Sequence, residues 1–351
     1  MKLKIQELSD QNIQAWDAYV NEHQDGTVFH LSKWKKVIEK SFGHKSHYLI
    51  ATSGDRSPVN DKNAIEGILP LFHLKSRMFG NYFVSIPFAE IGGAIADDDD
   101  VRKRLSAEAC RIAEEAGCDY LELRNRRPVD NFKTKDLYFN FRREIFSDLD
   151  DNLMAIPRKA RRMIRQGDKH GLTFEFGCHQ IDTFYSIMCS SYRNLGTPIF
   201  SKRFFTNFLK AFDDHCQILM IRSKEGQPVA GVMSFFFKDQ VLPYYAGSEF
   251  EFRRLAPNDF MYWQLMKYGC EKGYKLFDFG RSKVDTGSYH FKRHWGFKAE
   301  PLAYQYYLIR MNELPNLSPT NPRYKKKIEM WRNLPLWATR MIGPPIAKYL
   351  G

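Results

Sequence analysis

The chain has 351 residues, enough for about two domains of ordinary size. Hydrophobic residues make up 43% of it, yet no run approaches the roughly 20 apolar residues that a membrane helix needs, which excludes a spanning segment. The formal net charge of +12 favours anionic partners, namely phosphates, nucleic acid or an acidic membrane surface.

Two further features concern compartment and metal content. The first residues, Met1–Gln6, lack the apolar core of a secretory signal, so we expect a cytoplasmic protein. The six cysteines are scattered, a distribution typical neither of a disulfide framework nor of a zinc site. We therefore expect no metal site and no nucleophilic thiol.

The first half of the chain has the pattern of a mixed sheet with helices on its faces. After Gly26–Trp34 come a helical stretch and a strand at His47–Ala51, and a β-rich run follows at Ile65–Phe72. Asp97–Asp100 precede an apolar-periodic helix, which they suit as N-terminal caps. That helix ends at Gly117, where a positive φ is favoured, before a strand.

A basic helix follows a boundary that we expect near residue 150. Arg158, Arg162, Arg165 and Lys169 recur at helical spacing and therefore form one stripe. The stripe is consistent with contact to RNA or another phosphate-rich molecule, and equally with an ordinary solvated face.

The second half repeats the first. Gly196–Phe204 introduces a helix, Gln217–Ile221 and Val229–Phe236 read as strands, and a second helix ends at Gly273 before Tyr274–Arg281. Four matched segments in the same order indicate a duplicated domain. Each copy reads as helix, helix, three strands, helix, strand and an extended segment. We expect an α/β fold, with units at 1–150 and 151–310.

With the repeat established, the second half is recognisable. Phe277–Lys283, Thr286–Lys292 and Trp295–Phe297 together resemble the C-terminal signature of FemAB-like acyltransferases, and most closely the subgroup associated with exosortase/PEP-CTERM exopolysaccharide systems. The resemblance covers roughly residues 5–345. It implies tandem GNAT-like (acyl-CoA N-acyltransferase-like) domains. The best-known members of the family transfer amino acids from aminoacyl-tRNA to peptidoglycan precursors, and relatives are acetyltransferase-like.

One segment departs from the GNAT pattern. GNAT acetyltransferases carry an Arg/Gln-x-x-Gly-x-Gly/Ala turn whose backbone N–H groups bind the CoA pyrophosphate. Phe252–Asp259 lies at the matching place without the glycines, with Asn258 or Asp259 as the expected helix cap. This argues against acetyl-CoA as the donor. We expect no permanently bound cofactor, and an acyl donor, aminoacyl-tRNA or acyl-CoA, as the co-substrate.

Acyl transfer needs a held donor, hydrogen-bond donors for the developing oxyanion, and a route for the proton. In a GNAT-like sheet two diverging strands provide the first two, and here they are expected at Val241–Gly247 and Lys275–Phe279. Arg281 follows the second strand and could bind a phosphate or carboxylate, or pair with a neighbouring carboxylate. Asp278 could accept a proton, or could serve in structural hydrogen bonding.

The candidate site residues fall into two groups. The catalytic candidates are Asp278, Arg281 and Tyr245. The substrate-binding candidates surround the signature block and a cleft that we expect between the units: Lys33, Trp34, Tyr192, Arg193, Thr197, Tyr244, Ser282, Lys283, Thr286, Gly287, Tyr289 and Lys292. Phe291 and Trp295 share a helical face and are expected to pack in the core.

The tail, residues 311–351, differs from both copies. Basic residues at 323–327 precede an apolar segment that begins at Trp331. Such a segment could lie in a membrane interface or pack on the first domain, and we expect the packing.

Taken together, these features favour an acyl- or aminoacyltransferase acting on an amine or hydroxyl of a cell-envelope or exopolysaccharide precursor, in the cytoplasm or at the inner face of the membrane. A catalytically silent protein that binds a polysaccharide or lipid-linked precursor is the alternative. A nucleic-acid-binding module has only the charge and the basic helix in its favour.

Overall fold

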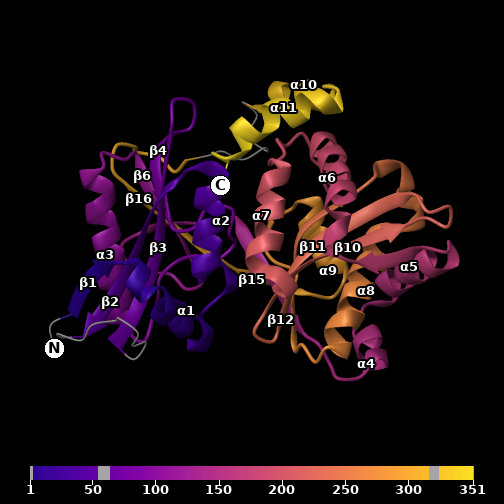
Figure 1. Cartoon of the computed structure of the whole chain (residues 1–351), viewed down its shortest axis with the longest axis horizontal. Coiled ribbons are helices and arrows are strands. Elements are labelled where there is room, and N and C mark those ends of the chain that lie inside the picture. The colour runs from indigo at the N-terminus through magenta and orange to yellow at the C-terminus, as the bar shows by residue number, and fades with distance from the viewer. Residues whose placement is uncertain (1–2, 54–63, 316–323, 351) are drawn as a thin grey trace. The chain divides into compact units, whose positions relative to one another are not determined.

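The computed structural model describes residues 3–53, 64–315 and 324–350. The chain divides into two compact units. The first comprises Met1–Tyr138, Pro301–Asn316 and Tyr349–Gly351, and the second comprises Phe139–Glu300 and Leu317–Lys348. Each unit contains an eight-stranded sheet with helices packed against it (Figure 1).

The first unit has strand order β1-β2-β3-β4-β6-β16-β7, with β5 paired to β3. Only β4 and β6 pair in parallel. Its strands are β1 (Leu3–Glu7), β2 (Lys45–Ser53), β3 (Ile65–Ser76), β4 (Gly80–Val84), β5 (Ile95–Ala96), β6 (Tyr120–Asn125), β7 (Lys133–Lys135) and β16 (Ala303–Leu308), and its helices are α1 (Ile13–Glu22), α2 (Ser32–Phe42) and α3 (Asp99–Glu115).

The second unit has strand order β9-β10-β11-β12-β13-β8-β14, with β15 paired to β8. Its strands are β8 (Tyr138–Glu144), β9 (Thr173–Phe176), β10 (Cys216–Arg222), β11 (Pro228–Phe237), β12 (Gln240–Ser248), β13 (Leu276–Asp278), β14 (Ser282–Lys283) and β15 (Lys298–Pro301). Its helices are α4 (Leu149–Met154), α5 (Arg158–Lys169), α6 (Ile181–Leu195), α7 (Lys202–Phe212), α8 (Pro257–Glu271), α9 (Gly287–His294), α10 (Lys325–Arg332) and α11 (Leu336–Ala347).

The two sheets have the same order of strands, which confirms the predicted duplication. The matched segments form corresponding elements: α2 and α7, then β2 and β10, then β3 and β11. Gly117 and Gly273 both follow a helix with positive φ, 60° and 77°. The expected element order lacked one strand, because each copy has a short strand, β1 or β9, before its matched pair of helices, α1 and α2 or α6 and α7.

The division into units differs from the expected 1–150, 151–310 and 311–351. β8 directly follows the first unit in sequence but pairs with β13 in the second sheet. β16 follows the second unit but pairs with β6 and β7 in the first sheet. The second sheet therefore contains a strand that follows the first copy in sequence, and the first sheet contains a strand that follows the second copy. The first boundary lies at Tyr138 rather than near residue 150.

The helices form where apolar residues recur at helical spacing. In α2, Trp34, Val37 and Ile38 are buried while the lysines between them point outward. In the second unit β11 is buried along Val229–Phe237, because helices cover both faces of its sheet.

Alternating side chains of β10 show which helix covers which face of the second sheet. Leu219 and Ile221 belong to a core cluster that also contains residues of α5 and α8. Met220 points to the opposite face, where it lies against Gly231 beside Phe184 of α6. The sheet is therefore sandwiched between α8 with α5 on one face and α6 on the other (Figure 1).

The basic stripe predicted on α5 is confirmed: Arg158, Arg162, Arg165 and Lys169 are all exposed. Ala160, Ile164 and Gly167 form the buried face, and Gly167 lies directly against Phe260 of α8. The predicted cap of the acidic segment is also confirmed, since the Asp98 carboxylate accepts the Val101 N–H at 2.8 Å.

The expectation that the tail packs on the first unit is corrected for α10 and α11. Both helices belong to the second unit and pack against α6, while Tyr349 contacts the first unit through the Tyr82 hydroxyl. The sequence pattern predicted a basic segment followed by an apolar one. It did not indicate which surface of the protein the apolar side chains contact. Residues 316–323 and Gly351 lie outside the described part of the tail. Among the described helices, none has the length and hydropathy that spanning a membrane requires.

Candidate active site

The second sheet opens between β12 and β13. These parallel strands pair only at Gln240 with Leu276 and at Val241 with Phe277. Beyond that point β12 carries a bulge, because Met233 faces Tyr245 while Ser234 faces Pro243, which leaves Tyr244 as the extra residue. The short ladder is what two diverging strands would give, as predicted, and the bulge interrupts the regular pairing of β12 with β11 beside it.

The corresponding place in the first unit is closed by its own chain. After β4 the Ser85 N–H donates to the Glu122 carbonyl at 2.9 Å, and Gly92 and Gly93 both donate to the Arg124 carbonyl. The Arg124 side chain is 2% exposed and donates to Glu122 at 2.8 Å and to the Ala89 carbonyl at 2.7 Å. The first unit therefore lacks the open arrangement of the second.

A buried polar turn follows β13. The Asp278 carboxylate accepts the Gly280 N–H at 2.9 Å and the Asn140 amide at 3.3 Å. Lys292 of α9 donates to the carbonyls of Gly280 and Arg281 at 2.8 and 3.1 Å. Two oppositely charged side chains, each less than a tenth exposed, thus bind the two sides of one glycine that has φ 69°.

These contacts bear on two of the expected roles. The bonds of Asp278 correspond to the structural alternative, and its role as a proton acceptor stays a prediction. Lys292 was expected in an accessible loop or short helix as a point charge for an anionic ligand. It is instead buried, because the carbonyls of the turn converge on its ammonium group. It is a positioning residue for the segment that carries Arg281.

Arg281 is half-buried and lies directly after the turn. Ser282 beside it is 4% exposed, and its hydroxyl has no hydrogen-bond partner in the described part of the chain. The Lys283 side chain is half-buried, and its carbonyl accepts the Thr286 hydroxyl at 2.7 Å. Arg281 and Lys283 are thus two half-buried cations in the segment that follows β13.

The α9 helix supplies three of the remaining candidates. Thr286 is its N-cap and accepts the Tyr289 N–H, a structural role, and Gly287 is its first residue. Tyr289 is half-buried with its ring edge-on to Phe139 and Phe141 of β8.

The aromatic pair on β12 is divided by the bulge. Tyr245 is 7% exposed and lies among rings of α7, including Phe205 at 5.2 Å between ring centroids. Tyr244 is half-buried and packs edge-on to Phe235. Of the two, Tyr244 is the one with an accessible side chain.

The expected cleft residues are distributed over both units. In the first unit Lys33 is exposed, but Trp34 is completely buried and edge-on to Phe29, which corrects the expectation that its ring is open to a substrate. In the second unit three residues lie at the end of α6 and are half-buried: Tyr192, Arg193 and Thr197. Their meeting in one cleft stays a prediction.

The segment without glycines contains one residue in a conformation typical of glycine. Ala256 has φ 54° and ψ 45°, a left-handed conformation that glycine adopts without strain, and α8 begins at the next residue. The expectation that Asn258 or Asp259 caps the helix is corrected. Both lie inside the first turn, and no side chain caps the N-terminus of α8.

Asp259 is half-buried in that first turn, where its carboxylate accepts the Trp295 indole N–H at 2.9 Å. Burial raises the pKa of Asp259. A raised native pKa means that this group stabilises the fold below its unfolded pKa, and that the contribution is lost as the pH rises through the native pKa. We expect Asp259→Asn to raise the free energy of unfolding by up to about 1 kcal/mol at pH 7, because the amide oxygen still accepts the bond. The gain should shrink as the pH falls and vanish below about pH 3, under the unfolded pKa of aspartate, in urea titrations at several pH values.

Asp182 provides the matched control, since it lies in the first turn of α6 but is 77% exposed. Asp182→Asn should show no such pH-dependent gain. A pH-independent difference for Asp259→Asn would contradict the buried-charge explanation.

Sequence reasoning missed the contributions of β8. Asn140 contacts Asp278, and Arg143 donates to the carbonyls of Ala155 and Trp295 while stacking on Phe297. Burial lowers the pKa of Arg143 to about 10. The alternation of polar and apolar residues in Tyr138–Glu144 gives a strand signal but no signal of which sheet the strand joins. The predicted core position of Trp295 is confirmed, as it is completely buried.

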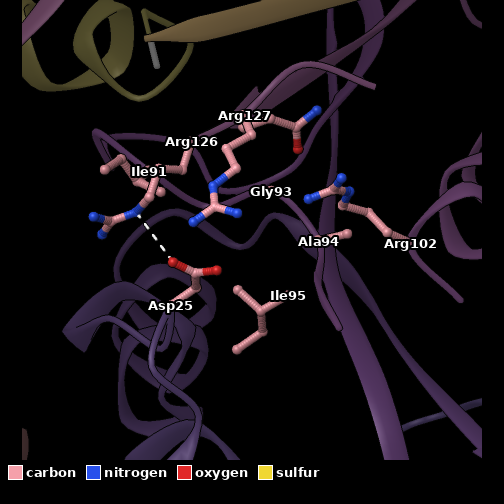
Figure 2. Close-up of a pocket in the computed structure, with 9 residues that line it drawn as sticks. Asp25, Ile91, Gly93, Ala94, Ile95, Arg102, Arg126 and Arg127 are labelled. Carbon is pink, nitrogen blue, oxygen red and sulfur yellow. Dashed lines mark ion pairs between the residues drawn. The ribbon is translucent and has the colours of Figure 1, made fainter. Parts of the chain in front are cut away.

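Figure 2 shows residues that line a pocket in the first unit, among them Arg102, Arg126 and Arg127 together with Asp25. Two of these arginines face carboxylates. Arg126 lies 3.7 Å from Asp25, and Arg102 donates to Asp99 at 2.6 Å. Most of the positive charge of this pocket is therefore balanced within the protein, and the second unit remains the candidate active site.

Comparison with known proteins agrees with this placement. Residues 156–293, most of the second unit, match the family described as acetyltransferase (GNAT) domain. No curated protein sequence matches the chain.

Solved structures with the same fold cover nearly the whole chain. FemX is 16% identical with a TM-score of 0.66, covering 92% of this chain and 99% of its own. L-PGS from Bacillus licheniformis is 14% identical with a TM-score of 0.56, covering 96% and 98%. A tandem GNAT protein from the clavulanic acid biosynthesis pathway is 11% identical with a TM-score of 0.52, covering 87% and 97%.

The predicted fold class is thereby confirmed. The chain consists of two GNAT-fold units in tandem, and its second unit, which holds the open pair of strands, carries the match to the acetyltransferase (GNAT) domain.

Proposed function

We propose that this chain is an acyl- or aminoacyltransferase whose reaction takes place at the opening between β12 and β13. The observation that supports the proposal most directly is the short parallel ladder, which ends after two residue pairs and is followed by the bulge at Tyr244. Backbone N–H groups at such an opening can donate to the carbonyl oxygen of a donor, where negative charge develops in the transition state.

The proposed reaction is a single acyl transfer. The amine nitrogen or hydroxyl oxygen of the acceptor forms a bond to the donor carbonyl carbon, and the bond from that carbon to the carrier oxygen or sulfur breaks. The proton of the nucleophile passes to the leaving carrier, through water or through Asp278 or a tyrosine of β12. Arg281 binds a phosphate or carboxylate of the donor and thereby holds the carbonyl at the opening.

The donor is an aminoacyl-tRNA or an acyl-CoA. The exposed stripe on α5 supports a phosphate-rich donor, since four cations on one helical face can follow a nucleic-acid backbone. The left-handed Ala256 supports a relationship to the phosphate-binding turn of GNAT enzymes, although the side chain of alanine occupies space that glycine leaves free.

The acceptor is an amine or hydroxyl of a cell-envelope or exopolysaccharide precursor, in line with the resemblance to the FemAB subgroup. The accessible candidates for its binding are Lys33, Tyr192, Arg193, Thr197, Tyr244 and Lys283. The reaction is proposed to occur in the cytoplasm, at the inner face of the membrane.

The test is direct. The purified chain is incubated in turn with aminoacyl-tRNAs and CoA thioesters, and release of the free carrier is followed by mass spectrometry. We expect release from one class of donor, enhanced by an envelope-precursor acceptor.

If tRNA is the carrier, the triple variant Arg158→Gln, Arg162→Gln, Arg165→Gln should weaken tRNA binding at least ~10-fold. Arg203→Gln, which replaces an exposed residue of α7, should not weaken it. Absence of release with every donor would favour the non-catalytic binding protein.

A further inference from the structure

The two tail helices are held on the second unit by one side only. In α11 the buried residues are Thr339, Gly343 and Ala347. Gly343 lies so close to the chain at Ile199 that an added Cβ would come within 3.0 Å of its carbonyl oxygen. Trp331 is the buried residue of α10. Figure 1 shows both helices, in yellow, beside α6.

Several large apolar side chains of the two helices are exposed. Trp337, Met341 and Ile342 lie four and five residues apart on α11, with 66%, 69% and 45% of their surface exposed. Met330 of α10 is 65% exposed. We call these four residues the tail face. Large exposed apolar side chains, when they form a patch, mark a surface that binds another apolar phase.

The charge of the residues around the tail face indicates which kind of apolar surface it binds. Residues 324–350 contain six basic residues and one acidic residue, Glu329. Lys325, Lys326 and Lys327 are all exposed at the start of α10, and Arg332 is exposed in its last turn. A tryptophan and methionines beside lysines are the combination by which amphipathic helices lie in the headgroup region of an anionic bilayer.

We propose that the tail face docks on the surface of an anionic lipid bilayer. Trp337, Met341, Ile342 and Met330 enter the boundary between headgroups and acyl chains, and the lysines of α10 bind lipid phosphates. The 12 residues of α11, which include Pro344 and Pro345, are too few to span a bilayer, so the helices lie along its surface. This attachment is independent of the proposed transfer reaction and of the identity of its donor.

The experiment is sedimentation of the full chain with vesicles of phosphatidylcholine, with and without phosphatidylglycerol. We expect binding to the vesicles that contain phosphatidylglycerol. Trp337→Ser with Met341→Ser should lower the partition coefficient at least ~10-fold, because two large apolar side chains no longer enter the bilayer. The triple variant Lys325→Gln, Lys326→Gln, Lys327→Gln should lower it ~10-fold or more on anionic vesicles and leave any binding to neutral vesicles unchanged.

Met78→Ser is the matched control, since Met78 is 74% exposed but belongs to the first unit, and it should bind as the unaltered chain does. Circular dichroism and the release of carrier from a water-soluble donor should be the same for the double variant and the unaltered chain, which separates attachment from catalysis. Equal vesicle binding by the double variant, or no vesicle binding by the unaltered chain, would overturn the proposal. The second result would instead leave the tail face to a protein partner.

Discussion

Lys292→Met is expected to lower the free energy of unfolding by about 2–4 kcal/mol, because methionine leaves two carbonyls of the turn after β13 without their charged donor. Urea denaturation measures the loss. We expect carrier release to fall at least ~10-fold under conditions in which the variant is folded, since the segment that carries Arg281 is no longer held.

Lys275→Met supplies the comparison. Lys275 is exposed directly before β13, at the end of the strand away from the turn, and we expect its replacement to change the free energy of unfolding by no more than about 0.5 kcal/mol. Asp278→Asn combined with Lys292→Met should cost less than the sum of the single variants, since both side chains hold the same turn at Gly280. Additive costs would show that Asp278 and Lys292 act independently.

The parts of the fold that the sequence predicted are local or repeated. Gly117 and Gly273 each end a helix before a strand, and similar segments recur in the same order in both halves, so the two copies could be inferred without coordinates. The diverging strands of the second copy were expected from the resemblance to GNAT-like folds. The cap at Asp98 and the stripe on α5 were predictable for the same reason, since they depend on residues within one or two helical turns.

The exchanged strands could not be inferred in this way. Tyr138–Glu144 and Ala303–Leu308 alternate as strands do, and this alternation specifies which side chains share a face. It carries no information about the partner strand, which depends on backbone hydrogen bonds to residues more than 130 positions away in the case of Asp278 and Arg142. Unit boundaries drawn from sequence order therefore placed both strands in the neighbouring copy.

The candidate site shows a similar limit. Lys292 has charged and polar neighbours in sequence and reads as a surface lysine, and its burial depends on how the turn at Gly280 folds back over α9. In the first unit, closure of the equivalent opening depends on N–H groups of Ser85, Gly92 and Gly93, which leave no side-chain pattern. Backbone hydrogen bonds determine both features.

Arg281→Ala is expected to lower kcat/KM for transfer at least ~100-fold, the effect typical of losing one positioned charged donor at a developing or bound anion. The free energy of unfolding should change by less than about 1 kcal/mol, because the Arg281 side chain is only half-buried and its backbone carbonyl remains bound to Lys292. Steady-state release of carrier, measured by mass spectrometry beside urea denaturation of the same preparation, separates the two effects.

Arg281→Lys and Arg203→Ala complete the comparison. Lysine keeps the charge but lacks the planar pair of donors, so Arg281→Lys should recover only part of the lost rate if the bound group is a phosphate or carboxylate held by two hydrogen bonds. Arg203 is exposed on α7, and its replacement should leave turnover unchanged. Unchanged turnover in Arg281→Ala would remove this residue from the site, whereas a large loss of stability with recovery of the rate in Arg281→Lys would indicate that Arg281 pairs with a carboxylate of the protein instead of a ligand.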